Sequence, residues 1–283
     1  MKSWANGFFD GKGKMAISIN NNIVKAALLQ FDVALGHIPP NMEKVEQGVR
    51  RLAEAGADLV VLPEMWSCGF DYERLEGHAA ETPAVLERLG KLASLCHVNV
   101  AGSLPRETEK GIANSLVLVD RNGRVTESYD KVHLFSPGDE HRHFAGGERA
   151  VVCDTDLGRI GLMICYDLRF PELCRTLALS SAEIIVIAAQ WPLARKAHWE
   201  TLIRARAIEN QVFVIAANRC GSDPKLDYAG HSAIVGPWGE NLALAGDGEA
   251  ELLADLNLAD LEQVRTAIPC YADRRPKVYG KDL

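Results

Sequence analysis

The chain has 283 residues, of which 47% are hydrophobic and 24% charged, and its formal net charge is −7. This composition is typical of a globular protein with a sizeable core, in one large domain or two. The acidic balance offers no basic surface for nucleic acid, and the longest apolar runs are too short to span a bilayer, so neither nucleic acid nor a membrane is an expected partner.

The beginning of the chain and its cysteines bear on the cellular compartment. Residues 1–22 are expected to form an N-terminal extension, because the first fourteen residues lack the continuous apolar segment of a secretory signal. Seven cysteines, an odd number, lie scattered in apolar contexts and do not suggest a disulfide framework. We therefore expect a cytoplasmic protein.

The first half of the chain alternates strands and helices. Apolar periodicity predicts helices over 41–56 and 83–96. Short apolar runs predict strands at 23–31, 58–62, 98–102, 113–119 and 124–129. The last two strands form a hairpin, because Asn122-Gly123 supplies the turn between them.

The second half repeats this alternation after a polar loop that ends near Gly147. Strands are predicted on both sides of a turn at 154–158 and at 183–189, 212–218, 229–235 and 241–245. Helices are predicted from Pro171, over 197–211 and over 258–266. No break in composition interrupts residues 23–268, so we expect one α/β domain there, followed by a polar tail at 269–283.

Cys165 stands where an apolar run ends, in RIGLMICYDLRFPEL, six residues before the helix that Pro171 opens. A thiol at a strand-to-helix corner faces the free N–H groups and the dipole of the helix, which favours the thiolate and resembles a nucleophile elbow. A single Cys in an apolar run is more often an inert core residue. The neighbouring polar residues must therefore decide between the two interpretations.

Polar residues end three other apolar runs as well: Glu64, Gln190 with Trp191, and Asn218. Ligands in α/β proteins bind beyond the carboxyl ends of strands, so these side chains are expected to gather at one edge.

A cysteine that attacks an amide or nitrile carbon needs a proton acceptor and a cation facing the developing oxyanion. Glu64 can supply the first and Lys131, which follows the hairpin, the second. Glu140 adds a second carboxylate nine positions after Lys131.

Three ordered blocks, VVLPE, DKVHLF and ICYDLRFPE, with RAIENQ as a fourth, resemble the nitrilase or carbon–nitrogen hydrolase superfamily. This resemblance implies a four-layer α-β-β-α sandwich that forms a homodimer or a higher homo-oligomer. It also implies roles: Cys165 as nucleophile, Glu64 as general base and then acid, Lys131 and the Tyr166 N–H as oxyanion donors, and Glu140 as the additional carboxylate. No cofactor or metal is implied, and His141 and His143 lack the matched partners of a metal site.

The blocks GDEHRHF and AAQWP look most like the ω-amidase branch, whose substrates are small 2-oxo acid amides such as 2-oxoglutaramate. Membership of this branch implies that the enzyme releases ammonia and forms a thioester on Cys165. A carboxylate-bearing substrate favours a guanidinium, for which Arg169 and Arg142 are the candidates, with Trp191 as a pocket wall. Arg169 could equally pair with Glu172 or Asp167, and Trp191 could equally be interior packing.

Several alternatives remain open at this point. Within the superfamily the substrate could be an N-carbamoyl compound or a nitrile. A Cys–His hydrolase would use His133, His198 or His231 as its base, but would leave the Glu and Lys blocks unexplained. A binding scaffold of the same fold would need neither Cys165 nor water. Replacing Cys165 by Ala would separate an enzyme from a scaffold, because only an enzyme would lose activity, and replacing each His would expose the Cys–His alternative.

Overall fold

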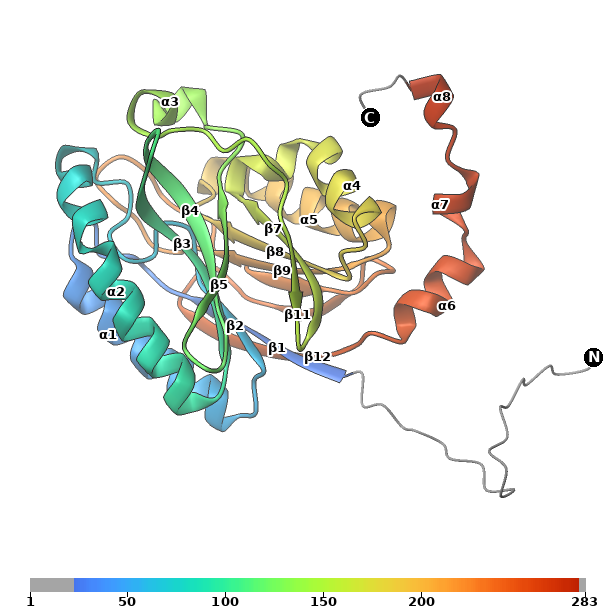
Figure 1. Cartoon of the computed structure of the whole chain (residues 1–283), viewed down its shortest axis with the longest axis horizontal. Helices are drawn as coiled ribbons and strands as arrows, with labels where there is room; N and C mark the ends of the chain where they lie inside the picture. Colours follow the sequence, from blue (N-terminus) through green and yellow to red (C-terminus); the bar gives the residue numbers. More distant parts are fainter. Residues whose placement is uncertain (1–22, 280–283) are drawn as a thin grey trace, which may run out of the picture.

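The computed structural model describes residues 23–279; residues 1–22, predicted as an extension, and residues 280–283 lie outside the described part. Two six-stranded sheets face each other, and helices cover their outer faces (Figure 1). The predicted four-layer α-β-β-α sandwich is confirmed.

The first sheet combines strands from the two ends of the domain. Its three central strands are parallel, a hairpin follows on one side, and an antiparallel strand closes the other side. In spatial order the strands are β12 (Ala250–Asn257), β1 (Ile23–Gln30), β2 (Leu59–Val61), β3 (Asn99–Thr108), β4 (Gly111–Val119) and β5 (Val125–Asp130).

The second sheet repeats the same pairing pattern, with three parallel strands between antiparallel neighbours. In spatial order its strands are β11 (Asn241–Leu244), β10 (Ala233–Val235), β9 (Phe213–Asn218), β8 (Ile184–Ala189), β7 (Gly158–Ile164) and β6 (Val152–Thr155). The similar runs of β8 and β9 are therefore parallel neighbours.

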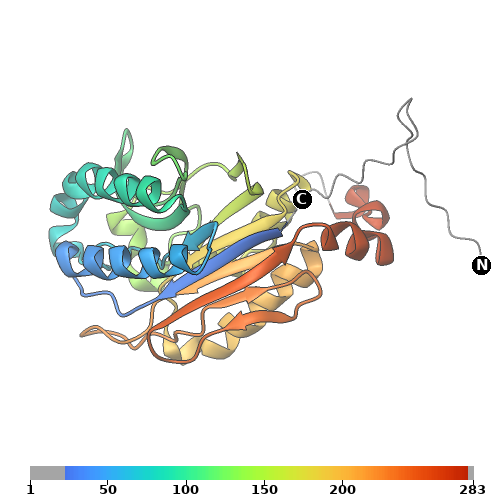
Figure 2. The same ribbon diagram turned by 90° about the horizontal axis from the view of Figure 1, so that it is seen from below.

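Helices α1 and α2 cover the first sheet, and α4 and α5 cover the second (Figures 1 and 2). The α-helices are α1 (Ile38–Glu54), α2 (Leu75–Cys96), α3 (Glu140–His143), α4 (Pro171–Leu179), α5 (Lys196–Asn210), α6 (Asp260–Ala267), α7 (Cys270–Asp273) and α8 (Pro276–Tyr279). Four short 3₁₀ turns are η1 (Tyr72–Arg74), η2 (Ser136–Gly138), η3 (Cys165–Arg169) and η4 (Leu193–Arg195).

The strands are apolar on both faces because each sheet lies between two layers. In β1, Ala26 and Leu28 pack into the core between the sheets, whereas Ala27 and Leu29 pack against α1 and α2. Strands buried on both faces give continuous apolar runs rather than alternation, which is why the sequence reveals them. In β2, β8 and β9 polar side chains are consequently confined to the strand ends and the loops that follow.

The largest differences between the predicted elements and the structure concern α2 and β12. Helix α2 begins at Leu75 instead of Pro83, so the proline lies inside it. Proline removes one helical N–H, and here the preceding Thr82 donates its hydroxyl to the Pro105 carbonyl of the adjacent strand, which anchors the helix at this point. Strand β12 was not predicted at all, because AELLADLN is rich in helix-favouring Ala, Leu and Glu.

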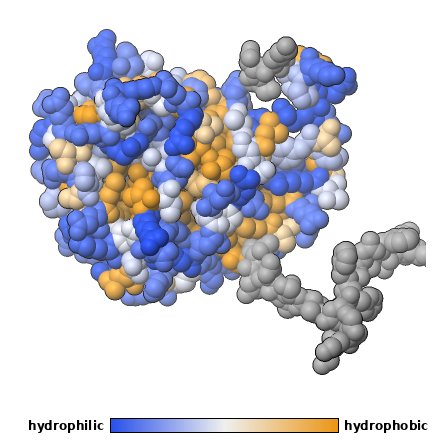
Figure 3. Space-filling model, viewed as in Figure 1, coloured by the Kyte–Doolittle hydropathy of each residue, from blue (hydrophilic) through white to orange (hydrophobic). Residues whose placement is uncertain are grey.

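The C-terminal segment is partly helical. Helix α6 packs Leu261 and Val264 into the core, while α7 and α8 extend beyond the sandwich (Figure 2). Within residues 23–279, no helix is long and apolar enough to cross a bilayer. The face shown in Figure 3 is largely hydrophilic, with apolar patches toward its centre.

Candidate active site

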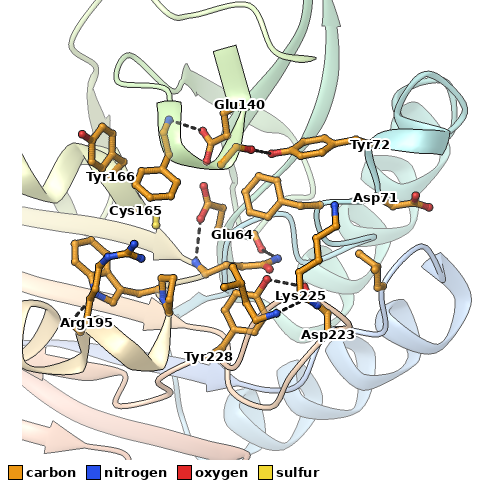
Figure 4. A pocket seen from close by; sticks show the side chains of 18 of the residues that line it. Glu64, Asp71, Tyr72, Glu140, Cys165, Tyr166, Arg195, Asp223, Lys225 and Tyr228 are labelled. Atoms are coloured by element: carbon orange, nitrogen blue, oxygen red, sulfur yellow. Dashed lines mark hydrogen bonds between the residues drawn. The ribbon is translucent and has the colours of Figure 1, made fainter. Parts of the chain in front are cut away.

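A cavity of about 330 Å³ opens beside the carboxyl ends of β2, β7 and β8. Glu64, Cys165 and Gln190, which follow these three strands, all line it (Figure 4). The structure thus gathers residues that are far apart in the chain at one edge of the two sheets. This edge is where ligands bind in α/β proteins.

Glu64 is fully buried, and both of its carboxylate oxygens are occupied by donors. Oε1 accepts hydrogen bonds from Lys131 Nζ at 2.7 Å and from Asn114 Nδ2 at 2.8 Å. Oε2 accepts the Gln190 N–H at 2.9 Å. These bonds stabilise the ionised carboxylate and fix its orientation, as a general base requires.

Lys131 is also fully buried, and its ammonium joins two carboxylates. Nζ lies 2.7 Å from Glu64 Oε1 and 2.9 Å from Glu140 Oε1. Burial alone would lower the pKa of Lys131, but Glu140 and Glu64 outweigh it and raise that pKa well above its usual 10.5. The two neighbouring carboxylates thus favour the charged form of Lys131.

Glu140 begins the short helix α3 and is 4% exposed. Burial raises the pKa of Glu140, and the ion pair with Lys131 opposes this. Its Oε2 also accepts the Phe135 N–H at 3.2 Å, which ties α3 to the loop that follows Lys131. Glu64 and Glu140 line the cavity, whereas Lys131 joins them from behind without lining it. We call these three residues the floor of the cavity.

Cys165 is the first residue of η3 and adopts φ = 43°, a left-handed conformation that is unusual for a residue with a side chain. The turn directs the thiol toward Glu64 (Figure 4). Burial, and next the Glu64 carboxylate, raise the pKa of Cys165 well above its usual 9.0, while Lys131 opposes them. The sequence predicts a favoured thiolate; in the structure burial and the Glu64 carboxylate oppose the thiolate, and α4 begins only at Pro171, after η3.

Asp167, whose role the sequence did not reveal, fastens the nucleophile turn to the loop that carries Lys131. Its buried carboxylate accepts the Ile164 N–H at 2.9 Å and the Tyr129 hydroxyl at 2.7 Å on Oδ2. Oδ1 accepts the His133 N–H at 3.1 Å and faces His133 Nδ1 at 2.8 Å. The only sequence signal was an acidic residue two positions after the cysteine, which the structure places in the interior.

The predicted substrate-binding residues divide into two groups. Tyr166, Arg169 and Trp191 line the cavity. Trp191 is 2% exposed, so it both packs in the interior and forms the wall. The guanidinium of Arg169 lies over the Trp191 ring, 4.6 Å from its centroid, and makes no ion pair with Glu172 or Asp167.

Arg142 does not belong to this cavity. Its side chain is 69% exposed, forms an ion pair with Asp139 at 3.3 Å, and lines a separate surface hollow near the start of α2. Arg142 therefore lies outside the cavity onto which Cys165 opens, and its role in substrate binding stays a prediction. Helix α3 turns Glu140 inward, and the side chain two positions later points outward.

Two cations of the cavity wall were missed in the sequence. Arg195 lies in η4, with its guanidinium 5.5 Å from the centroid of the Phe135 ring. Lys225 lies in the loop between β9 and β10, with its ammonium 5.9 Å from the centroid of the Tyr72 ring. Neither residue belongs to a block that suggested function, and loop cations are common on any surface.

The histidines of the Cys–His alternative are placed elsewhere. No histidine is among the described residues that line the cavity. His133 faces Asp167, His198 contacts Arg169, and His231 lies between Glu200 and Asp247. The geometry therefore favours Glu64 over a histidine as the base that serves Cys165. In residues 23–279, no three His, Cys, Asp or Glu side chains are grouped to hold a metal ion.

A family model described as carbon-nitrogen hydrolase matches residues 25–266. The chain belongs to this family. It is 38% identical over 253 residues to a 2-oxoglutaramate amidase of Bacillus subtilis (strain 168), which covers 89% of this chain and 97% of the relative. It is 36% identical over 252 residues to an ω-amidase of Escherichia coli (strain K12), which covers 88% of this chain and 96% of the relative.

Among solved structures, a variant of an amidase from Nesterenkonia sp. AN1 superposes with a TM-score of 0.81 at 28% identity, over 90% of this chain and 95% of that chain. In that structure the acetamide moiety of fluoroacetamide is covalently attached to the active-site cysteine. The predicted resemblance to carbon–nitrogen hydrolases of the ω-amidase branch, and the prediction of an amidase, are confirmed.

Proposed function

We propose that this hydrolase cleaves the amide of small carboxylate-bearing amides of the 2-oxoglutaramate type, with Cys165 as the nucleophile. The observation that carries the proposal is the opening of Cys165 onto a cavity of about 330 Å³ directly beside the buried Glu64–Lys131–Glu140 set. A cavity of this size suits a small molecule. The names of the two relatives support the choice of substrate.

In the first half-reaction, Glu64 accepts the thiol proton while the sulfur attacks the amide carbonyl carbon. A C–S bond forms, and the carbonyl electron pair moves to oxygen, where Lys131 and the Tyr166 N–H stabilise the oxyanion. Collapse breaks the C–N bond, and Glu64 gives its proton to the departing nitrogen. Ammonia and a Cys165 thioester result.

In the second half-reaction, Glu64 deprotonates a water molecule that attacks the thioester. The C–S bond breaks, the proton returns to sulfur, and the carboxylic acid leaves. The raised pKa of Cys165 fits this order of steps, because the thiol proton then leaves during the attack on the carbonyl carbon rather than before it. Glu140 holds Lys131 and, as the resemblance implies, helps to position the substrate.

Products from a matched substrate panel test the proposal. We expect 2-oxoglutaramate to yield ammonia and 2-oxoglutarate, at rates well above those for an N-carbamoyl acid or a nitrile of similar size. Carbon dioxide from the carbamoyl acid, with the amide left intact, would overturn the choice of substrate, and so would exclusive turnover of the nitrile. Cys165→Ala is the inactive reference, and Cys96→Ala, a half-exposed cysteine on α2, is its matched control.

We also propose that residues 23–268 form the hydrolase domain, with 269–283 as a tail, and that the protein is a cytoplasmic homodimer or higher homo-oligomer. The family match at residues 25–266 supports the domain, and seven unpaired cysteines support a reducing compartment. Sedimentation equilibrium measures the oligomeric state directly, and a monomer at micromolar concentration would contradict the proposal.

A further inference from the structure

Three cations in the wall of the cavity rest on aromatic rings. Each guanidinium or ammonium lies within cation–π distance of a neighbouring ring. The three pairs are Arg169 on Trp191, Arg195 on Phe135 and Lys225 on Tyr72. Among the described residues none of these cations forms an ion pair, although carboxylates neutralise the buried cations Lys131 and Arg219.

Arg195 is the best prepared of the three to bind an anion. Its backbone is fixed, because its N–H donates to the Pro192 carbonyl at 3.0 Å and its carbonyl accepts the Trp191 Nε1–H at 2.8 Å. Its half-buried side chain has no hydrogen-bond partner among residues 23–279. A half-buried guanidinium whose N–H donors are unused can form hydrogen bonds to a ligand that supplies two oxygens side by side.

The other two cations are less suited to a two-point contact. Arg169 already has Nη1 at 3.3 Å from His198 Nδ1, and it stacks more closely on its ring. Lys225 is exposed and enters the cavity from the side opposite to Arg195 (Figure 4). An ammonium attracts an anion as a point charge, whereas a guanidinium fork matches both oxygens of a carboxylate.

Because the floor carries more carboxylates than ammonium groups, an acidic substrate needs a cation in the cavity wall. Two carboxylates, Glu64 and Glu140, face a single ammonium, Lys131, at 2.7 and 2.9 Å. Of the other lining carboxylates, Asp71 and Asp223 have arginine partners, whereas Glu73 forms no ion pair among the described residues. An entering carboxylate is repelled by the floor and needs positive charge at the wall.

We propose that Arg195 is the residue that selects amides carrying a carboxylate, by forked hydrogen bonds to its two oxygens, and that Lys225 assists from the opposite rim. This inference rests on the proposed amidase function. It assigns the carboxylate end of the substrate to η4 and leaves the amide end at Cys165. Neutral amides of equal length gain nothing from Arg195.

The test compares glutaramate with pentanamide, which has a methyl group where glutaramate has its carboxylate. We expect Arg195→Met to lower kcat/KM for glutaramate about 10- to 100-fold, mainly through KM, which corresponds to the loss of hydrogen bonds to a charged group. The value for pentanamide should stay within about twofold, because methionine keeps the apolar stem. Arg195→Lys should recover part of the loss, and Lys225→Met should cost only a few-fold and less at high salt.

Arg159→Met is the matched control, since Arg159 is an exposed arginine paired with Asp154 at the other end of β7. An unchanged glutaramate to pentanamide ratio in Arg195→Met would overturn the inference, and so would an equal loss for both substrates. If the wild type hydrolyses neither amide, the proposed function fails separately. Calorimetric titration of glutarate into Cys165→Ala, with and without Arg195→Met, then still decides whether Arg195 binds a carboxylate.

Discussion

The charged residues of the floor and those of the cavity wall differ in whether protein groups bind them. On the floor, Glu64 and Lys131 are fully buried, donors bind both carboxylate oxygens of Glu64, and two carboxylates bind the ammonium of Lys131. On the wall, Arg195 and Lys225 rest on aromatic rings without an ionic partner. The floor is thus organised before the substrate arrives, as electrostatic catalysis requires, whereas the substrate completes the wall.

The largest expected effect removes the nucleophile from this floor. Cys165→Ala should lower amide hydrolysis by at least about 10⁴-fold, since no other group can form the thioester. Steady-state ammonia release measures it, with circular dichroism to verify folding. Residual activity above a few per cent would show that another group attacks the amide, and the contrast between floor and wall would lose its meaning.

The next largest effect is expected when the two floor carboxylates lose their cation. Lys131→Met should abolish activity and lower the free energy of unfolding by about 3–5 kcal/mol near pH 8, because the buried charges lose their partner. Without Lys131 the pKa of Glu140, already raised by burial, rises further above its usual 4.5. The folded variant then binds a proton more tightly than the unfolded chain, so its deficit relative to wild type should shrink as the pH falls toward 5.

Urea denaturation at pH 8 and pH 5 measures this difference. Lys91→Met is the control, because Lys91 forms an exposed pair with Glu87 on α2 and should change stability far less. A deficit that grows toward acid pH would contradict the assignment of buried, ionised carboxylates.

A smaller effect is expected at Asp167, which connects the turn of Cys165 to the loop that carries Lys131. Asp167→Asn places an amide N–H₂ among three donors and the His133 ring nitrogen, so it should lower kcat about tenfold and stability by about 1–3 kcal/mol. KM should change little, since Asp167 is a positioning residue that does not line the cavity. Steady-state kinetics test this against Asp154→Asn, an exposed carboxylate on β6. A loss confined to KM would argue that Asp167 acts on substrate binding.

The smallest effect is expected at Arg142, and it tests which residues belong to the cavity wall. Arg142→Met should change kcat/KM for glutaramate by less than about twofold, because Arg142 is exposed and paired with Asp139 outside the cavity. The same assay serves as for Arg195. A tenfold loss would mean that the loop carrying α3 rearranges around the substrate.

Much of the architecture could be predicted from the sequence, and the reason is physical. Both sheets are covered on both faces, so most strands appear as continuous apolar runs, and the residues that end those runs lie at one edge. Glu64, Lys131 and Cys165 could be proposed as a set because their chemistry is complementary. The structure then shows them side by side.

What could not be predicted depends on contacts between distant segments. Strand β12 has a helix-favouring composition and becomes a strand only because β1 offers it an edge along its whole length. Asn114, which donates to Glu64, lies in the middle of β4, where no pattern distinguishes it. Arg195 and Lys225 come from separate loops and acquire significance only where those loops meet around the cavity.

The pairing of β1 with β12 also affects how the enzyme is made. Strand β1 needs a partner, β12, that is synthesised after every other described strand, in register from Ile23 opposite Asn257 to Gln30 opposite Ala250. Until then, the nascent chain carries an open strand edge, which is prone to pairing with other chains. Productive folding should therefore wait until β12 has left the ribosome, and a premature stop before β12 should yield aggregates rather than a weakened enzyme.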